Sequence, residues 1–377
     1  MLNLRHLASL AAITRLGSLS AAAQAISLTQ PALTQGLAKL ERQFGEPLFE
    51  RLPSGMSPTA ATQMLVPRIE VAFAHIASPR VTMAQMRALI ALADAGSYPW
   101  ASAATGLSQP TLHRAVGDLS IGLSRVLVER RGKGIAFTDA GRRTVRAFRL
   151  ARAEIVAGLS EVAALRGYET GRITVGAMPL SRARLLPAAL TTFHRARPDV
   201  EIRIVEGSHA ELIEPLRDGE IDLLIGALRD PSPGEDVVQL PLFEDQPVVI
   251  ARAGHPLAKT SDTTPALLAA YPWTISAPGT PLRLLWERMF MRADVPLPPV
   301  PVECGSVITI RQMLLDSDFL TLLSPDQIAV ELEAGWLTQI GDAPAGLRRI
   351  IGITTRNGWR PTGMQQCFLD QLNLSVS

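Results

Sequence analysis

The stretch Gln30-Pro31-Ala32-Leu33 occurs again, 79 residues later, as Gln109-Pro110-Thr111-Leu112. The same offset relates other stretches, in which Gly17-Ser18 recurs as Gly96-Ser97, Leu48-Phe49-Glu50-Arg51 as Leu127-Val128-Glu129-Arg130, and Thr59 as Thr138. The register holds without a gap from about residue 4 to residue 59. Because a repeated segment is one structural unit, the sequence predicts two consecutive modules of the same fold.

Each copy shows the pattern of a helix, a sharp turn and a second helix with a capping residue. In the first copy, Gly17-Ser18 ends one helix, and Ser20 is expected to cap the next over Ala21–Ala25. Thr29 is expected to cap a third helix, whose first turn accepts Pro31 because no amide partner is needed there. Residues 46–55 then predict a strand, a turn and a wing. The pattern is typical of a winged helix-turn-helix, whose recognition helix enters the major groove of DNA.

The third helix of the first copy has one buried side and one open side. A buried stripe is predicted at i, i+4, i+7 and i+11, formed by Leu33, Leu37, Leu40 and Phe44. The candidate DNA contacts lie on the open side and in the wing: Thr29, Gln30, Pro31, Ala32, Thr34, Gln35, Lys39 and Arg51.

The second copy keeps the stripe, as Leu112, Val116, Leu119 and Leu123, but changes the open side. Its candidate DNA contacts are Ser108, Gln109, Thr111, His113, Arg114, Arg130, Arg131 and Lys133. Arginine pairs with guanine edges or phosphates, whereas glutamine pairs with adenine. We therefore expect the copies to prefer different sequences, and the second to show the stronger salt-dependent component. An alternative is that one copy has lost DNA contact and serves as a dimerisation unit or spacer, which Asp118 on the second open side slightly favours.

Charge is distributed unevenly along the chain. Residues 1–76 hold 6 Lys/Arg and 4 Asp/Glu, and residues 77–167 hold 13 and 6, whereas residues 168–377 hold 18 and 25. A basic first part and an acidic second part indicate a nucleic-acid-binding region joined to a region with another task.

Composition also bounds the compartment. The two cysteines, Cys304 and Cys367, are too few for a disulfide framework and indicate a reducing compartment. Arg5, His6 and Arg15 interrupt the apolar start, which makes it a poor signal peptide. No apolar run approaches the roughly 20 residues of a membrane span. We expect a cytoplasmic protein with no membrane partner.

The first copy closely resembles the DNA-binding end of LysR-type transcriptional regulators. The residues that carry the resemblance are Thr29-Gln30-Pro31-Ala32-Leu33-Thr34, Leu40-Glu41, Gly45, Pro47-Leu48-Phe49-Glu50-Arg51 and Pro58-Thr59. The second copy is a weaker match, with Ser120 and Ser124 in place of Glu41 and Gly45. The usual family member has one such module, so the tandem arrangement is a departure from which neither half-site spacing nor oligomeric state carries over.

The helical stretch Arg142–Leu165 resembles the linker helix of the family, which pairs two subunits. Its counterpart in the first copy, Thr59–Ile76, contains Pro67, which is expected to kink it. The resemblance implies a homodimer or a homotetramer. Two arrangements stay open: a dimer that presents four modules to a longer operator, or two modules of one chain on half-sites about 34–36 Å apart.

From Gly171 onward, strand patterns alternate with helix patterns, which predicts parallel sheets with helices on both faces. Two α/β lobes follow each other, residues 348–355 return as a strand, and residues 364–374 close as a helix. This half resembles the effector domain of the family, which is similar to periplasmic binding proteins that close on a ligand by hinge motion. The expected domains are 1–78 and 79–139 (winged helix-turn-helix), 140–168 (linker helix) and 169–377 (α/β effector domain).

Ligands of open α/β sheets bind beyond the carboxyl ends of strands, often at helix N-termini. The candidate ligand-binding residues at such positions are Met178, Ser181, Ser208, Ala227, Ser276 and Ser306, although each serine also suits an ordinary N-cap. Candidates for neutralising an organic acid are Arg182, Arg184, Arg283 and Arg311. Residues 316–324 and 359–362 are similar to those of regulators of sugar or aromatic-acid catabolism, which implies an organic or aromatic acid or a sugar as effector.

Catalytic chemistry is not indicated. The six histidines show no metal-ligand spacing, Gly207-Ser208-His209 is not a hydrolase elbow, and no phosphate-binding glycine loop is present. We expect no enzyme, no cofactor and no metal. The sequence predicts a regulator that binds double-stranded DNA and a small-molecule effector, with RNA polymerase as a further candidate partner. The alternative is a ligand sensor that acts through protein partners and uses its winged modules for oligomerisation.

Overall fold

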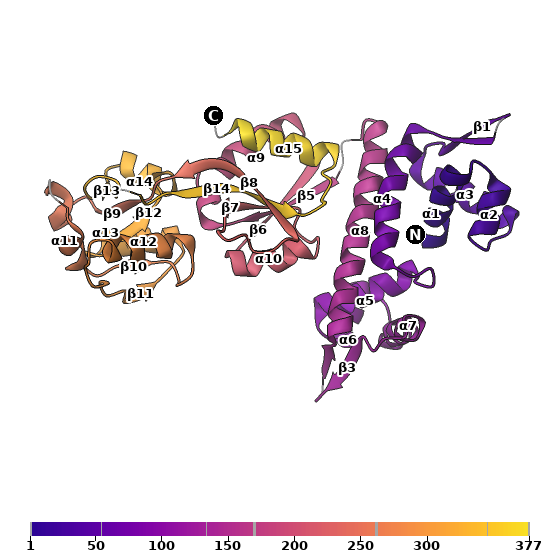
Figure 1. The fold of residues 1–377 in the computed structure, drawn as a ribbon, viewed down its shortest axis with the longest axis horizontal. Coiled ribbons are helices and arrows are strands. Elements are labelled where there is room, and N and C mark those ends of the chain that lie inside the picture. Colours follow the sequence, from indigo (N-terminus) through magenta and orange to yellow (C-terminus); the bar gives the residue numbers. More distant parts are fainter. Residues whose placement is uncertain are drawn as a thin grey trace. The chain divides into compact units, whose positions relative to one another are not determined.

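The computed structural model describes residues 2–53, 55–132, 134–168, 171–260, 263–344 and 346–375 (Figure 1). The chain divides into two compact units. The first unit contains Met1–Gly171 with two short additions, Asp218–Glu220 and Thr362–Met364, and the second contains the remainder. We describe each unit by itself.

The first unit contains the two predicted winged modules. The first module has α1 (Leu4–Leu16), α2 (Leu19–Ala25), α3 (Gln30–Phe44), β1 (Phe49–Leu52) and β2 (Gly55–Pro58). The second has α5 (Met83–Ala95), α6 (Tyr98–Thr105), α7 (Gln109–Gly122), β3 (Val128–Arg131) and β4 (Gly134–Phe137). Each of these elements begins 79 residues after its counterpart, so the repeat predicted from the sequence is confirmed as a repeat of structure.

Hydroxyl groups cap both recognition helices as expected. Thr29 accepts a hydrogen bond from the Ala32 amide, and Ser108 accepts one from the Thr111 amide, each at 3.3 Å. The prediction that Ser20 caps α2 is wrong, because Ser18 accepts from the Ala21 amide at 3.4 Å. Gly17 ends α1 in the left-handed conformation, which leaves the next residue extended and in place to cap.

Two long helices join the modules. They are α4 (Ala60–Ile76), which continues past Pro67, and α8 (Asp139–Leu165). They pack side by side (Figure 1). The pair is antiparallel: α4 leads from the first module to the second, and Arg166 at the end of α8 donates back to the Phe44 carbonyl of the first module. One continuous hydrophobic core runs from α1 to α8.

The second unit has two lobes, each with its own sheet. The first lobe holds a five-stranded sheet in the order β6-β5-β7-β14-β8. Its strands are β5 (Gly171–Ala177), β6 (Val200–Glu206), β7 (Leu223–Ala227), β8 (Val237–Asp245) and β14 (Arg349–Arg356). Its helices are α9 (Leu185–Ala196), α10 (His209–Arg217) and α15 (Gly363–Leu374).

The second lobe has a three-stranded sheet in the order β12-β9-β13 and a parallel pair, β10-β11. The strands are β9 (Val248–Arg252), β10 (Thr274–Ile275), β11 (Val302–Glu303), β12 (Thr321–Leu323) and β13 (Leu337–Gln339). The helices are α11 (Pro265–Ala269), α12 (Pro281–Met291), α13 (Val307–Leu315) and α14 (Ala329–Glu333). Three 3-10 turns complete the unit: Pro179–Arg182, Pro256–Lys259 and Pro325–Ile328.

The prediction of parallel sheets is correct only in part. Strands β5 and β7 are parallel, but β14 runs antiparallel to β7 and β8, and β9 is antiparallel to β12 and β13. The reason lies in the connections. Strand β14 enters the first sheet from the second lobe rather than through a helical crossover, which parallel neighbours in sequence require. The predicted return strand and two-lobed α/β architecture are confirmed.

Candidate DNA-reading surfaces and effector cavity

The first recognition helix, α3, has the two sides that the sequence predicts. Leu33, Leu37, Leu40 and Phe44 are buried. Most candidate contacts are exposed, namely Thr29, Gln30, Pro31, Ala32, Gln35 and Lys39, whereas Thr34 is half-buried. Arg51 is exposed on strand β1 of the wing. The helix therefore presents a continuous polar strip whose contact with DNA is still a prediction.

Hydrogen bonds order the start of this strip. The Ser20 hydroxyl donates to Gln30 Oε1 at 2.9 Å, so the helix before the turn holds the first glutamine of the recognition helix. Thr34 Oγ1 donates to the Gln30 carbonyl at 3.0 Å. This role of Ser20 was not predicted from the sequence, because a hydroxyl at that position also fits a cap.

The second recognition helix, α7, buries Leu112, Val116 and Leu119. The candidate contacts Ser108, Gln109, Thr111, His113 and Arg114 are exposed, as are Arg130 and Arg131 on strand β3. Lys133 lies outside the described residues. The His113 ring stacks on Tyr98 with centroids 3.5 Å apart, which orients the imidazole beside the exposed Arg114.

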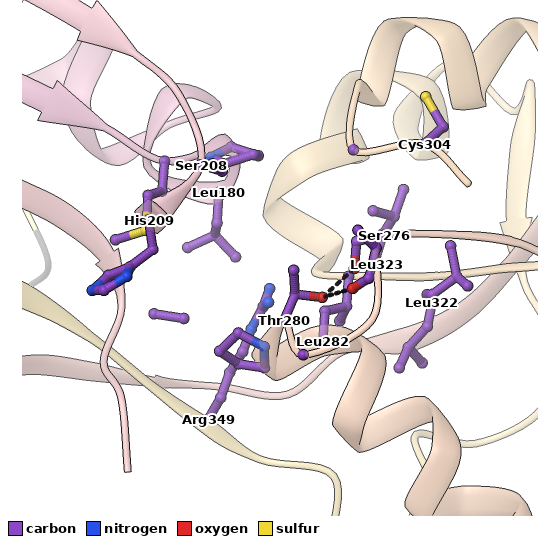
Figure 2. Close-up of a pocket in the computed structure, with 18 of the residues that line it drawn as sticks. Leu180, Ser208, His209, Ser276, Thr280, Leu282, Cys304, Leu322, Leu323 and Arg349 are labelled. Atoms are coloured by element: carbon purple, nitrogen blue, oxygen red, sulfur yellow. Dashed lines mark hydrogen bonds between the residues drawn. The ribbon is translucent and has the colours of Figure 1, made fainter. Parts of the chain in front are cut away.

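A cavity of about 610 Å³ lies in the second unit, between elements of its two lobes (Figure 2). The first lobe contributes Met178 and Leu180 after β5, Ser208 and His209 at the start of α10, and Arg229 after β7. The second lobe contributes residues around the start of α12, strand β12 and the turn at Cys304. Arg349, at the start of β14, also lines the cavity.

Four of the six candidate ligand-binding residues line this cavity: Met178, Ser208, Ala227 and Ser276. The other two are absent from its lining. Ser181 is fully buried and donates to the Met178 carbonyl at 2.8 Å. Ser306 caps α13 by accepting from the Thr309 amide at 3.4 Å, the ordinary role that a serine at a helix start can have.

The serines that reach the cavity already have partners. Ser208 donates to Glu211 Oε2 at 2.8 Å in a cap at the start of α10, and this contact with the Ser208 amide and hydroxyl lowers the pKa of Glu211. The hydroxyls of Ser276 and Thr280 lie 2.8 Å apart, as Figure 2 shows. Each hydroxyl still has acceptor capacity, since a serine or threonine oxygen carries two lone pairs.

The cationic residues of the cavity differ from those predicted. Arg283 pairs with Glu287 at 2.9 Å and Arg311 with Glu331 at 3.0 Å, whereas Arg184 lies 3.7 Å from both Asp326 and Glu333. None of these three lines the cavity, and the side chain of Arg182 lies outside the described residues. Arg229 and Arg349 line it instead. The segment after β7 was a predicted ligand position, but nothing in the sequence directed attention to Arg349.

The cavity has one arginine without a carboxylate partner among the described residues and a second arginine with an unused buried donor. Among the described residues, no carboxylate pairs with Arg229, its Nε is buried without a hydrogen-bond partner, and burial lowers its pKa. Arg349 donates from Nε to Asp245 at 2.6 Å, but its Nη2 is buried without a partner. No aspartate or glutamate occurs in the described lining. An anion is the ligand that would complete these groups.

His209 adds a neutral ring to this positive environment. Burial, followed by the charges of Arg229 and Arg217, lowers the pKa of His209 to about 4. The imidazole is therefore uncharged near neutral pH, and its buried Nε2 has no hydrogen-bond partner. It can donate to or accept from a ligand according to its tautomer.

The described part of the chain holds neither a candidate metal site nor a membrane-spanning helix. No group of three or more His, Cys, Asp or Glu residues there is placed to hold a metal ion. Nor does that part contain a helix with the length and apolar character needed to cross a membrane.

Comparisons with known proteins identify the family. Residues 166–375 match the LysR substrate binding domain, and residues 4–63 and 83–142 each match the bacterial regulatory helix-turn-helix of the lysR family. The chain belongs to the LysR family of transcriptional regulators. It is a regulator with two helix-turn-helix modules and a substrate-binding domain, and not an enzyme. The resemblance stated from the sequence is confirmed.

Individual relatives agree with this assignment. The transcriptional regulator GalR of Pseudomonas putida is 31% identical over 369 residues, which cover 94% of this chain and 93% of the relative, so both modules are included. CbbR of Xanthobacter flavus is 32% identical over 267 residues, 69% of this chain and 78% of the relative. Full-length OxyR from Pseudomonas aeruginosa shares the fold at 22% identity and a TM-score of 0.58, and covers 79% of this chain and 95% of its own.

Proposed function

We propose that this regulator binds DNA sequence-specifically through α3 and α7, and that a small organic anion in the cavity of the second unit modulates that binding. In this proposal residues 1–139 read DNA, 140–168 form the linker helix, and 169–377 sense the effector. The exposed polar strips of both recognition helices support the first part. Arg229, which has no carboxylate partner in the described lining, carries the second part.

Among the effector classes that the sequence left open, the lining favours the organic and aromatic acids over a sugar. Apolar side chains such as Leu180, Leu282 and Leu322 surround the cavity together with the two arginines. An uncharged sugar would leave the Arg229 guanidinium, whose Nε is buried without a hydrogen-bond partner, without an anion, which is unfavourable. A carboxylic acid with an apolar or aromatic body satisfies both the arginines and the leucines. We therefore assign the effector to the organic or aromatic acids.

Regulation follows if the acid prefers one arrangement of the two lobes. Since the cavity is lined from both lobes, a ligand that bridges them binds the closed arrangement more tightly and shifts the population toward it. A ligand with equal affinity for both arrangements would change nothing.

The test measures heat of binding and thermal stability with pairs of matched compounds, such as benzoate with benzamide. The acids are expected to bind, their amides to bind at least about tenfold more weakly, and Arg229→Met to abolish the difference. Arg184→Ala is the matched control, because that exposed arginine does not line the cavity. Equal binding of acids and amides would contradict the proposed effector class.

A second measurement separates this function from the alternative of a sensor that acts through protein partners. Retention of the intact protein on random-sequence DNA at moderate salt, with and without a bound acid, is expected to show binding that the acid alters. Absence of DNA retention in both conditions would favour the sensor, and retention that no bound acid changes would contradict effector control.

A further inference from the structure

Helices α4 and α8 correspond to the stretches that resemble the linker helix of the family, which would be expected to pair two subunits. Here the two helices pack against each other within one chain. Leu65 and Ile69 of α4 lie in the same buried core as Phe148 and Ile155 of α8. Gly158 of α8 permits close approach, because a Cβ there would lie 2.8 Å from Leu65 Cδ1 and 3.3 Å from Arg68 Cβ. The two helices therefore approach each other closely at this position, where a side chain larger than glycine would press on the end of Leu65.

A buried charge cluster crosses the same interface. Arg68 of α4 is only 4% exposed. Its Nη1 donates to Glu154 Oε2 at 3.2 Å, while its Nη2 and Nε donate to the two carboxylate oxygens of Glu161 at 2.6 and 3.2 Å. A buried ion pair is favourable only when both partners are present, since either charge alone is strongly destabilising.

The repeat offset shows that this cluster cannot form between two copies of the same helix. The α8 counterpart of Arg68 is Ala147, and the α4 counterpart of Glu154 is His75. Glu161 corresponds to Thr82, which lies beyond the end of α4. In a pair of two α8 helices, Ala147 would stand in place of Arg68, and in a pair of two α4 helices, His75 would stand in place of Glu154. This arrangement of one arginine between two glutamates is therefore specific to the α4–α8 pairing.

Both ends of α8 are tied to a winged module. At its C-terminal end, Arg166 Nη1 donates to the Phe44 carbonyl at 3.3 Å and Nε lies 3.6 Å from Glu46, both at the end of α3. Nearer its start, Arg149 pairs with Asp94 at the end of α5. Figure 1 shows α1–α3 beside one end of the helix pair and α5–α7 beside the other. The pair therefore spaces and orients both modules.

We propose that one chain is a covalently linked pair of DNA readers, in which α8 occupies on α4 the place that a second subunit's helix would take. A single chain then reads two adjacent, non-identical half-sites; this rests on the DNA binding proposed above. The 17 residues of α4 span about 25 Å. With one module at each end, that length is of the same order as the roughly 34–36 Å between half-sites one DNA turn apart.

The two strips predict how the half-sites differ. Gln30 and its counterpart Gln109 are the same residue, so both half-sites should share an adenine at one position. Gln35 and its counterpart Arg114 differ, as do Lys39 and Asp118. Because arginine favours guanine, the half-site under α7 should carry guanine where the half-site under α3 does not.

The first arm of the test asks which chain supplies the partner of α4. In the full-length protein with Cys304→Ser and Cys367→Ser, the pair Leu65→Cys and Gly158→Cys is oxidised and analysed on a denaturing gel. Cross-linked protein at the mass of one chain is expected. Cross-linked dimers would mean that α4 and α8 pair between chains and would overturn the proposal. Glu70→Cys with Gly158→Cys is the control, because Glu70 is exposed and should form no cross-link.

The second arm asks whether one chain reads both half-sites. Gln30→Ala with Gln35→Ala disables the first strip, and Gln109→Ala with Arg114→Ala disables the second. Footprinting on a DNA selected by the unmodified protein should show that each variant loses protection of a different half-site and binds at least about tenfold more weakly. A mixture of the two variants should not regain the affinity of the unmodified protein for the full site, because neither chain carries both strips.

The outcomes separate this proposal from the proposed function. Recovery of the unmodified affinity by the mixed variants, or loss of the same half-site by both, would overturn the proposal that one chain binds both half-sites, although DNA binding stands. A different result is that the unmodified protein selects no DNA while the cross-link forms within one chain. The proposed DNA-binding function would then be wrong, and so would the proposal that one chain binds two half-sites. Only the pairing of α4 with α8 within one chain would stand.

Discussion

The two winged modules have the same backbone but different surfaces. The turn after the recognition helix contains Gly45 in the first module and Ser124 in the second, and both residues adopt positive φ, at 70° and 52°. The turn before that helix shows the reverse exchange, with Ser27 at 54° and Gly106 at 70°. Packing therefore holds these turns even where glycine is replaced. The departure of Ser124 from the family pattern does not alter the fold of the module.

The exposed side chains, in contrast to the turns, differ between the two modules. Gln35 corresponds to Arg114, Lys39 to Asp118 and Leu52 to Arg131, and each of these residues is exposed. Buried positions keep their apolar character because the core requires it, whereas solvent-facing positions are free to acquire separate tasks. The duplicated winged module therefore carries two different exposed surfaces on one fold.

The largest expected effect is on stability and comes from a substitution in the α4–α8 pair that connects the modules. Arg68→Ala should lower the free energy of unfolding by about 3–5 kcal/mol, because Glu154 and Glu161 stay largely buried after the loss of this arginine. Urea unfolding of the full chain, followed by far-ultraviolet circular dichroism, measures the loss. Replacing all three charges together with Leu or Met should recover most of the stability. A single-variant loss below about 1 kcal/mol would show that the cluster does not hold the helices together.

The next largest effect is on base discrimination by the two recognition helices. Arg114→Ala should cost about 1–3 kcal/mol of discrimination at one base pair of one half-site, and Gln35→Ala should do so in the other half-site. Competition binding with single-base variants of the selected DNA measures both. If both substitutions relax the same base pair, the strips do not read separate half-sites.

A smaller effect concerns the wings. Removing Arg130 and Arg131 together should reduce the salt dependence of DNA affinity by roughly one to two units of slope, whereas Arg51→Ala should reduce it by about one at most. Affinity measured across a series of salt concentrations gives both slopes. Unchanged slopes for the second wing would mean that it does not contact phosphates.

The smallest expected effect distinguishes the modules by pH. Burial, and then the charge of Lys39, lowers the pKa of His6, whereas its counterpart in the second module is Gln85. Since the unfolded chain binds a proton more readily, stability should fall as pH decreases through about 6.5, by less than about 1 kcal/mol for this partly exposed ring. His6→Gln should remove that part of the pH dependence in unfolding experiments. A slope unchanged by His6→Gln would contradict this assignment.

The sequence predicted those features that depend on local spacing. Periodicity located the recognition helices and their buried stripes, because a helical face is visible as residues three and four positions apart. The partner of α4 was not predictable in this way, since an apolar face does not reveal which helix covers it. One of the two cations of the cavity was likewise not predictable: Arg349 reaches the cavity on a strand that returns from the other lobe, antiparallel to its neighbours. Ser20 was assigned to a cap because sequence cannot distinguish it from Ser18, which lies next to Gly17.

Selection of bound sequences from random DNA by the intact protein tests the central claim most directly. We expect two unlike half-sites about one DNA turn apart, which share an adenine and differ by a guanine. The variant with Gln109→Ala and Arg114→Ala should then select only the half-site of the first module. Selection of one half-site, or of two identical ones, by the intact protein would contradict the claim that a single chain carries two different DNA readers.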